Sequence, residues 1–134
     1  MDNVDQEILD ILRQNSRTTN QDVAKRVRLT EGAVRNRIKR LIQTGVIRRF
    51  TVETQAGAEA IVLIQTQTRG SKEILRRIRK HVNQMFETAG EFDVAVHLAV
   101  DNIATINEMV DRLRKVEGVT STVTLLKIAD GKLQ

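Results

Sequence analysis

The chain has 134 residues, of which 40% are hydrophobic and 29% charged, with a formal net charge of +5. These values are typical of a globular protein, and the length allows one ordinary domain or two small ones. The absence of cysteine excludes disulfides, thiolate catalysis and cysteine-ligated zinc. The longest aliphatic run, residues 60–64, is too short to cross a bilayer, and no leader-like segment opens the chain, so we expect a cytoplasmic protein without a membrane partner.

The excess positive charge lies in the first third of the sequence. Residues 1–50 hold eleven Lys/Arg against six Asp/Glu, whereas residues 51–134 hold eleven of each. A basic segment beside a neutral remainder predicts that the N-terminal part binds a polyanion and that the other part does something else.

Three short helices are predicted in the N-terminal part. The first covers residues 5–15, whose apolar side chains recur at helical spacing. The second covers residues 20–27 and begins after Thr19, a preferred N-cap residue. The third begins after a second such cap, Thr30, and ends before Gly45, because glycine commonly follows a helix C-terminus.

The last two of these helices are joined by only two residues, Arg28 and Leu29, which predicts a helix-turn-helix. Ala24 is small enough to let the two helices approach, and we expect Leu29 to fill the turn. In this motif the second helix enters the major groove of double-stranded DNA with its N-terminal residues at the base edges.

This geometry predicts two groups of DNA-binding residues, together with the cap Thr30. The group expected at base edges comprises Glu31, Gly32, Arg35, Asn36 and Lys39. The group expected at phosphates comprises Asn20, Gln21, Arg28, Arg37 and Arg40. Glycine costs about 0.5–1 kcal/mol relative to alanine inside a helix, so either close approach to DNA or a frayed first turn is needed to explain Gly32.

The run DVAKRVRLTEGAVRNRIKRLIQTGVIRRF, residues 22–50, resembles the DNA-binding domain of the Lrp/AsnC (feast/famine) transcription regulators. The shared pattern is a short helix with Val-Ala, a turn, then Thr, Ala-Val, Arg-Ile and Leu, closed by Gly-Val-Ile. The resemblance continues through the second half of the chain. It implies a sequence-specific, homo-oligomeric DNA-binding regulator of amino-acid metabolism.

The sequence divides into two predicted domains. A short strand is expected at residues 46–52, at the end of a DNA-binding domain that spans residues 1–52. Residues 53–59, ETQAGAE, are polar and rich in Gly and Ala, so we assign them to a linker. The second domain then covers residues 60–134.

The second domain is predicted to alternate strands and helices in the order β-α-β-β-α-β. The expected strands are residues 60–68, 82–88, 92–100 and 119–128, and the expected helices are residues 71–81 and 102–116. This order predicts a ferredoxin-like antiparallel sheet with both helices on one face. The whole chain is therefore expected to be α+β.

The face of this sheet away from the helices is predicted to pack on another sheet. In residues 92–100 we expect alternate side chains, beginning with Phe92 and Val94, to lie in the core, which leaves Ala95 and His97 on the other face. In the last strand Val119, Val123 and Leu125 are expected inward, and Thr120, Thr122, Thr124 and Leu126 outward. Small and hydroxylated side chains suit sheet-on-sheet packing, which predicts a homodimer. An ordinary solvent-exposed, threonine-rich face is the alternative.

Residues 86–93, FETAGEFD, carry a second resemblance to the family, in the order Gly, acidic residue, aromatic residue, Asp. In relatives this loop and the last strand form an amino-acid effector pocket between dimers. The resemblance implicates Gly90, Glu91 and Asp93, with Thr122 and Thr124 opposite. A carboxylate would bind the ammonium group of a free amino acid, and hydroxyls its carboxylate. A structural turn built on Gly90 is the competing explanation.

The phrases RRFTVE, AIVLIQT, FETAGEFD and NIATIN most resemble archaeal-type regulators of lysine biosynthesis. Glu87, Glu91 and Asp93 would suit an effector with a cationic side chain. The chain departs from the family pattern in having no proline, so the usual Pro-Gly turn is missing around residues 79–82. Its C-terminus also comes soon after the last strand.

Other functions are less compatible with the residues present. His81 and His97 are the only histidines, and neither has a nearby hydroxyl nucleophile or metal-ligand spacing, so no enzyme, metal or cofactor is expected. RNA binding on the sheet would need stacking aromatics, but the chain has three Phe and no Tyr or Trp. An architectural DNA-binding protein that ignores effectors is the remaining alternative.

Overall fold

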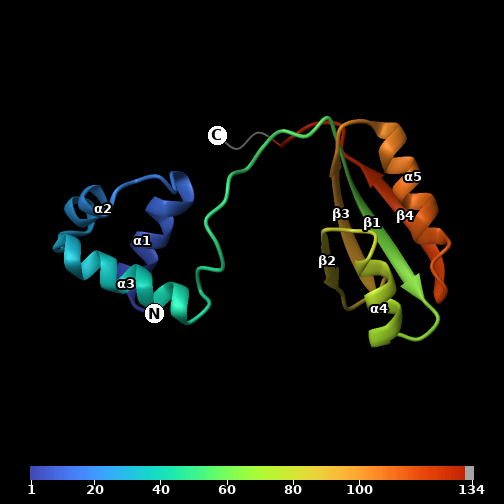
Figure 1. The fold of residues 1–134 in the computed structure, drawn as a ribbon, viewed down its shortest axis with the longest axis horizontal. Coiled ribbons are helices and arrows are strands. Elements are labelled where there is room, and N and C mark those ends of the chain that lie inside the picture. Colours follow the sequence, from blue (N-terminus) through green and yellow to red (C-terminus); the bar gives the residue numbers. More distant parts are fainter. Residues whose placement is uncertain (132–134) are drawn as a thin grey trace. The chain divides into compact units, whose positions relative to one another are not determined.

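The computed structural model describes residues 1–131, which divide into two compact units with the boundary in the sequence between Glu53 and Thr54 (Figure 1). The N-terminal unit contains three helices and the C-terminal unit contains a sheet with two helices. Each unit has its own cluster of buried apolar side chains. The α+β class predicted from the sequence is confirmed.

The N-terminal unit consists of α1 (Asn3–Gln14), α2 (Asn20–Val27) and α3 (Glu31–Gln43). Side chains cap all three helices: Asp2, Thr19 and Thr30 accept hydrogen bonds from the backbone N–H groups three residues later. Its buried cluster is formed by Ile8, Ile11, Leu12, Val23, Ala24, Val27 and Val34. Leu29 packs against this cluster from the turn, as expected.

The predicted strand at residues 46–52 is absent from the described chain, where this segment has no regular secondary structure. A strand is stable only when a neighbouring strand completes its hydrogen bonds, and the rest of this unit is helical. Ile47 is nevertheless held in place, because its backbone N–H donates to the Leu41 carbonyl at 3.0 Å.

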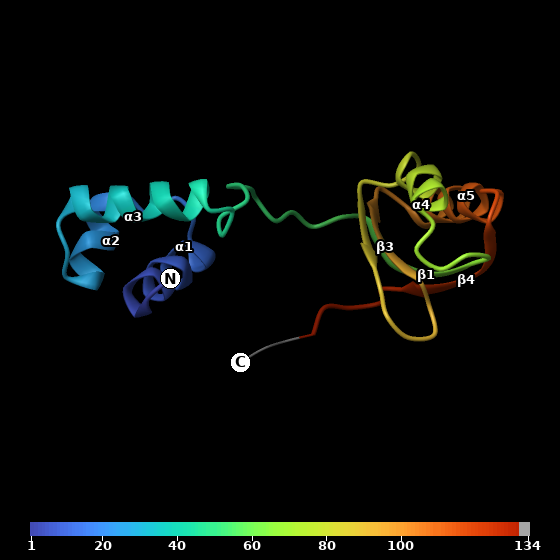
Figure 2. The same ribbon diagram turned by 90° about the horizontal axis from the view of Figure 1, so that it is seen from below.

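The C-terminal unit contains a four-stranded antiparallel sheet in the order β2-β3-β1-β4. Its elements are β1 (Ala58–Thr66), α4 (Lys72–Arg79), β2 (Gln84–Glu87), β3 (Val94–Val100), α5 (Ile103–Arg114) and β4 (Val119–Leu126). Both helices lie on one face of the sheet (Figure 2). This confirms the ferredoxin-like β-α-β-β-α-β arrangement.

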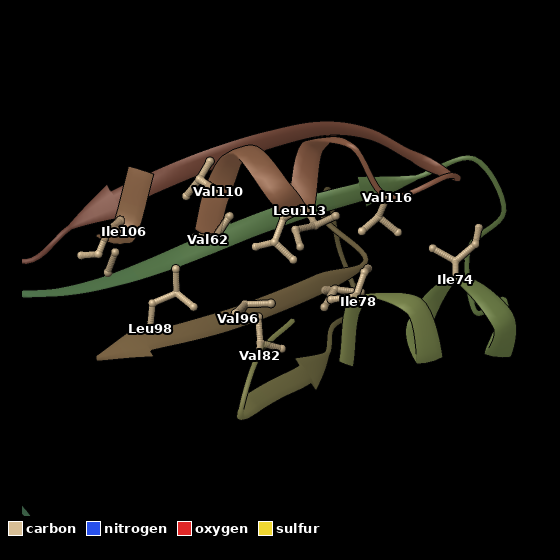
Figure 3. Packing of buried hydrophobic residues seen from close by; sticks show 13 residues of the cluster. Val62, Ile74, Ile78, Val82, Val96, Leu98, Ile106, Val110, Leu113 and Val116 are labelled. Atoms are coloured by element: carbon tan, nitrogen blue, oxygen red, sulfur yellow. The ribbon is translucent and has the colours of Figure 1, made fainter. Parts of the chain in front are cut away.

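The core of this unit lies between the two helices and the covered face of the sheet. Ile78 of α4 and Leu113 of α5 are fully buried and point toward Val62 and Val96 of the central strands (Figure 3). Ile103, by contrast, is 53% exposed because it occupies the first turn of α5.

The predicted facing of β4 is wrong from Thr122 onward, although Val119 packs against the buried cluster as predicted. The register pairs Val62 with Thr124, so this threonine lies on the helix-covered side of the sheet, as does Thr122 opposite Ile64. Val123 and Leu125 lie on the uncovered side and are 42% and 52% exposed. Both parities of β4 carry side chains compatible with burial, so alternation alone does not identify the face that meets the helices.

Candidate DNA-binding face and effector loop

The exposed face of α3 presents the polar side chains that were predicted to read bases. Val34 and Leu41 anchor the opposite face of the helix, with 0% and 3% of their surface exposed. Arg35, Asn36 and Lys39 are all exposed. This arrangement leaves guanidinium, amide and ammonium donors available to base edges and phosphates.

Glu31 contacts one of these groups directly. Its carboxylate forms an ion pair with the Arg35 guanidinium one turn later, and both side chains remain about half exposed or more. Glu31 therefore restricts the positions that the Arg35 side chain adopts. Sequence reasoning placed both residues at base edges without this link between them.

Gly32 lies in the first turn of α3 and has open space around it. A Cβ built at this position would meet no other atom within 4 Å. Packing within the unit therefore does not require glycine here. The open space leaves the backbone of the first turn accessible to a ligand.

Arg37 forms a polar link between α3 and the beginning of α1. Its Nη1 donates to Asp2 Oδ2 at 2.7 Å and to Asp5 Oδ1 at 3.1 Å, and its side chain is only 27% exposed. The hydrogen bond from Arg37, followed by that from the Asp5 backbone, lowers the pKa of Asp2 below its ordinary value. Arg37, which was predicted to bind phosphate, thus has two carboxylate partners within the unit.

The remaining predicted phosphate ligands lie around the start and end of α2 and on α3. Gln21 and Arg40 are exposed, and Asn20 is half-buried at the first position of α2. Arg28 ends α2 in the left-handed conformation with φ of 60°, which a non-glycine residue adopts at some cost. Its side chain is exposed beside the turn of the helix-turn-helix.

Asp93 is a structural centre of the predicted effector loop. It is 9% exposed, and its Oδ2 accepts hydrogen bonds from Thr66 N (2.6 Å) and Thr66 Oγ1 (2.9 Å). Its Oδ1 lies 2.8 Å from Arg69 Nη2. The hydrogen bonds from Thr66, and then the charge of Arg69, hold the pKa of Asp93 below its ordinary value. The carboxylate is therefore ionised and already bound by protein groups.

Arg69 also fixes the loop backbone. Its guanidinium donates to the carbonyl of Thr88 at 3.3 Å and to that of Gly90. Gly90 has a φ of 121°, which is unfavourable for a residue with a side chain. The loop thus contains the turn suggested as the alternative reading of its sequence, and Arg69 and Asp93 stabilise it.

Gln65 connects this loop to β4 and was missed by sequence reasoning. Its Nε2 donates to the Glu91 carbonyl at 2.9 Å, and its Oε1 accepts from Ser121 Oγ at 2.7 Å. The signal in the sequence was a glutamine directly after the apolar run of residues 60–64 in β1. Ser121 therefore reaches the loop through Gln65.

Thr122 and Thr124 lie on the other face of β4 from Ser121. Thr122 Oγ1 accepts from Arg114 Nε at 3.1 Å, and no hydrogen bond within residues 1–131 joins either threonine to the loop. Arg114 and residues 119–122 line a shallow hollow of about 270 Å³. The guanidinium and hydroxyls of this hollow are donors that a carboxylate ligand accepts from.

The uncovered face of the sheet exposes several apolar side chains. They include Ile61, Phe86, Val123 and Leu125, each more than 40% exposed. His97 lies on the same face, with Nε2 3.2 Å from Glu59 Oε1 and Nδ1 3.2 Å from Gln84 Oε1. Contiguous exposed apolar surface of this kind is typical of a protein interface.

Metal binding and membrane insertion are two further possibilities for residues 1–131. No group of three or more His, Cys, Asp or Glu side chains in this range is arranged to hold a metal ion. None of the helices in the described part of the chain has the length and apolar character needed to span a bilayer.

Comparison with known proteins assigns both units. Residues 1–48 match the family described as winged helix-turn-helix DNA-binding, and residues 59–130 match the Lrp/AsnC ligand binding domain. The HTH-type transcriptional regulator LysM of Sulfurisphaera tokodaii is 39% identical over 127 residues, which cover 91% of each chain. LysM of Saccharolobus solfataricus is 38% identical over 127 residues, covering 91% of this chain and 89% of that one.

Solved structures show the same fold. A transcriptional regulator of Neisseria meningitidis, solved in complex with L-Met, has a TM-score of 0.82 at 23% identity and covers 99% of this chain and 93% of its own. AsnC of Escherichia coli has a TM-score of 0.78 at 18% identity, with 100% and 96% covered. The matches to both domains and to the LysM regulators show that this chain is a DNA-binding transcription regulator, not an enzyme, and that it belongs to the Lrp/AsnC family.

Proposed function

We propose that this regulator controls genes of amino-acid metabolism and that a free amino acid, lysine or another basic one, modulates it. The observation that carries the proposal is the link through Gln65 between the loop at residues 86–93 and the hydroxyl-bearing start of β4. Glu87 and Glu91 are exposed and pair with no cation among residues 1–131, so they are available to an ammonium group. The neighbouring hollow beside Arg114 offers donors for a carboxylate.

The geometry refines the roles of the predicted effector residues. Glu91 is proposed to contact the ligand, whereas Gly90 and Asp93 shape the loop, because Asp93 is already saturated by Thr66 and Arg69. Thr122 is proposed to contact the ligand from the hollow beside Arg114, whereas Thr124 lies further along the helix-covered face of the sheet. The N. meningitidis regulator solved with L-Met supports an amino acid as the class of ligand.

The proposed assembly is a homodimer that associates further into an oligomer of dimers. The exposed apolar side chains of the uncovered sheet face support packing against a second copy. Residues 46–52 support it independently, because Phe50 and Val52 are 53% and 78% exposed in a segment whose predicted strand lacks a partner among residues 1–131. We propose that this strand forms against the same segment of a second copy.

The proposed DNA contacts follow from the exposed face of α3. Arg35, Asn36 and Lys39 would read bases, while Arg28, Arg40 and the start of α2 would bind phosphates. If so, Arg35→Ala and Asn36→Ala lower the affinity for a selected operator more than the affinity for random DNA. Equal reductions on both DNAs, measured by fluorescence anisotropy at one salt concentration, would disprove the base-reading role.

A thermal-shift screen of the twenty amino acids tests the effector proposal. A ligand present at 100 times its Kd adds about 2.7 kcal/mol to the free energy of unfolding, so one or a few basic amino acids are expected to raise the Tm. Glu91→Gln should reduce that shift. Glu108→Gln removes the same charge from an exposed position on α5 and should leave the shift unchanged.

An architectural DNA-binding role without an effector is the second candidate. It is favoured by one observation: Arg69 and Asp93, the charged groups that fix the loop, are paired with each other and Arg69 also donates to the loop backbone. A screen that shows no shift with any amino acid, while the protein still binds DNA, would establish this second candidate over the first.

A further inference from the structure

Helix α4 and the turn before it carry most of the positive charge of the C-terminal unit. Residues 69–80 hold six Lys/Arg against one Asp/Glu, whereas the rest of residues 51–134 holds five against ten. The neutral total of this part of the chain therefore combines a strongly basic segment with an acidic remainder. Such a separation of charge creates a local positive potential that the total does not reveal.

Two of the six cations are used inside the unit. Arg69 pairs with Asp93, and Arg77 pairs with Glu73 and Glu117. The other four are exposed and form no ion pair with a carboxylate of residues 1–131. We call them the basic stripe: Lys72, Arg76, Arg79 and Lys80.

The basic stripe occupies one side of α4. Its members follow Lys72 by four, seven and eight residues, a spacing that places side chains on one helical face. Ile74 and Ile78 are buried on the opposite side and point toward the sheet (Figure 3). The stripe is about 12 Å long at 1.5 Å per residue, a length that spans about three to four phosphates of one DNA strand.

The arrangement is unfavourable for the helix on its own. Lys72 and Arg76, and likewise Arg76 and Lys80, are four residues apart, where like charges repel each other. The helix dipole favours cations in the last turn but disfavours Lys72, which is the first residue of α4. A bound polyanion would convert these repulsions into a favourable interaction.

We propose that the basic stripe of α4 binds the phosphate backbone of DNA, as a second DNA-binding surface outside the helix-turn-helix. This inference rests on the DNA-binding function of the N-terminal unit. A duplex bound there is tethered to the same chain as the stripe, which raises the effective concentration of phosphates around the C-terminal unit. The interaction would carry no sequence information, because it involves phosphates and not base edges.

The test compares two double variants of the full-length protein that remove the same charge. Arg76→Gln with Arg79→Gln disrupts the stripe, whereas Arg112→Gln with Lys115→Gln removes two exposed cations at the end of α5 that form no ion pair within residues 1–131. Binding to a long mixed-sequence duplex is measured by anisotropy over a series of NaCl concentrations. The slope of log K against log salt should become shallower by about 0.9 for each phosphate that the protein no longer neutralises, in the stripe variant only.

A charge-preserving variant and two further outcomes complete the test. Arg76→Lys with Arg79→Lys should keep the parental slope. Equal slopes for the stripe variant and the α5 variant would overturn the proposal. If both variants still bind DNA, the DNA-binding function of the N-terminal unit stands whatever their slopes. A different outcome is a stripe variant that keeps the parental salt slope for DNA binding but loses a salt-sensitive self-association that the parent shows in sedimentation. That outcome would also overturn the proposal, and would assign the stripe to binding the acidic surface of a second copy.

Discussion

The two units of this chain use their charged residues in different ways. In the N-terminal unit the cations outnumber the anions, and most of them, including Arg28 and Lys39, are exposed. In the C-terminal unit the numbers balance, but ion pairs such as Arg69–Asp93 shape a loop while the basic stripe stays without a carboxylate partner among residues 1–131. Net charge therefore identifies a binding surface only when its distribution over the folded unit is known.

The largest effects are expected from core substitutions that test whether the units fold separately. Ile8 and Ile78 are both 0% exposed, one in each cluster. Truncation of either to alanine should cost about 2–5 kcal/mol of stability, in its own unit. Hydrogen exchange read separately for residues 1–53 and 54–131 measures this. Reduced protection in both units from one substitution would show that they unfold together.

Gly118→Ala is expected to be the next most damaging change, at about 2–3 kcal/mol. Gly118 has a φ of 101°, and a Cβ there would lie 2.6 Å from Ile74 Cδ1. Gly90→Ala is the matched control, because its φ of 121° is also positive but its Cβ would meet nothing within 4 Å. Urea unfolding of both variants separates backbone strain from the steric clash. Equal destabilisation of the two variants would mean that Ile74 moves aside freely.

A pH series should reveal how much the ionised Asp93 carboxylate of the effector loop contributes to stability. Because the pKa of Asp93 is lower in the folded state, its contribution to stability is present above its ordinary value of 3.8 and is lost as the pH falls through the folded pKa. Asp93→Asn should lower the Tm at pH 7 and flatten its decline below about pH 4. An unchanged acid profile in this variant would show that Thr66 and Arg69 do not favour the ionised form.

The smallest effect, and the only stabilising one, is expected for Gly32→Ala. With open space around this position, alanine should raise the free energy of unfolding by about 0.5–1 kcal/mol. If DNA approaches the backbone here, the same variant should bind DNA more weakly. A variant that is more stable and binds with parental affinity would show that Gly32 has no role in recognition.

The sequence predicted the positions of the helices and strands better than the segments that each of them contacts. The caps Thr19 and Thr30 and the order of strands and helices were predicted correctly because these signals are local. The strand at 46–52 was wrong for the described chain because a strand needs hydrogen bonds from another segment. The facing of β4 from Thr122 onward was wrong because apolar or small side chains occupy both of its parities.

The polar network of the effector loop was beyond sequence reasoning for a related reason. Gln65 bonds to Glu91 and Ser121, which are 26 and 56 residues away along the chain. Asp93 likewise bonds to Thr66, 27 residues earlier. One sequence alone contains no signal for pairs at such distances. The family resemblance pointed to the loop, but only the folded chain shows which of its carboxylates remains available to a ligand.

The hydrogen bonds of Asp2 have a consequence for which substitutions the chain tolerates. Its side chain starts α1 by accepting from the Asp5 backbone N–H, and it also receives the guanidinium of Arg37 from α3. Asparagine caps a helix as well as aspartate does but carries no charge. Position 2 can therefore exchange Asp for Asn without losing the start of α1, although the electrostatic hold on α3 would weaken. The helix-capping role of Asp2 and its ion pair with Arg37 can therefore be separated by one substitution.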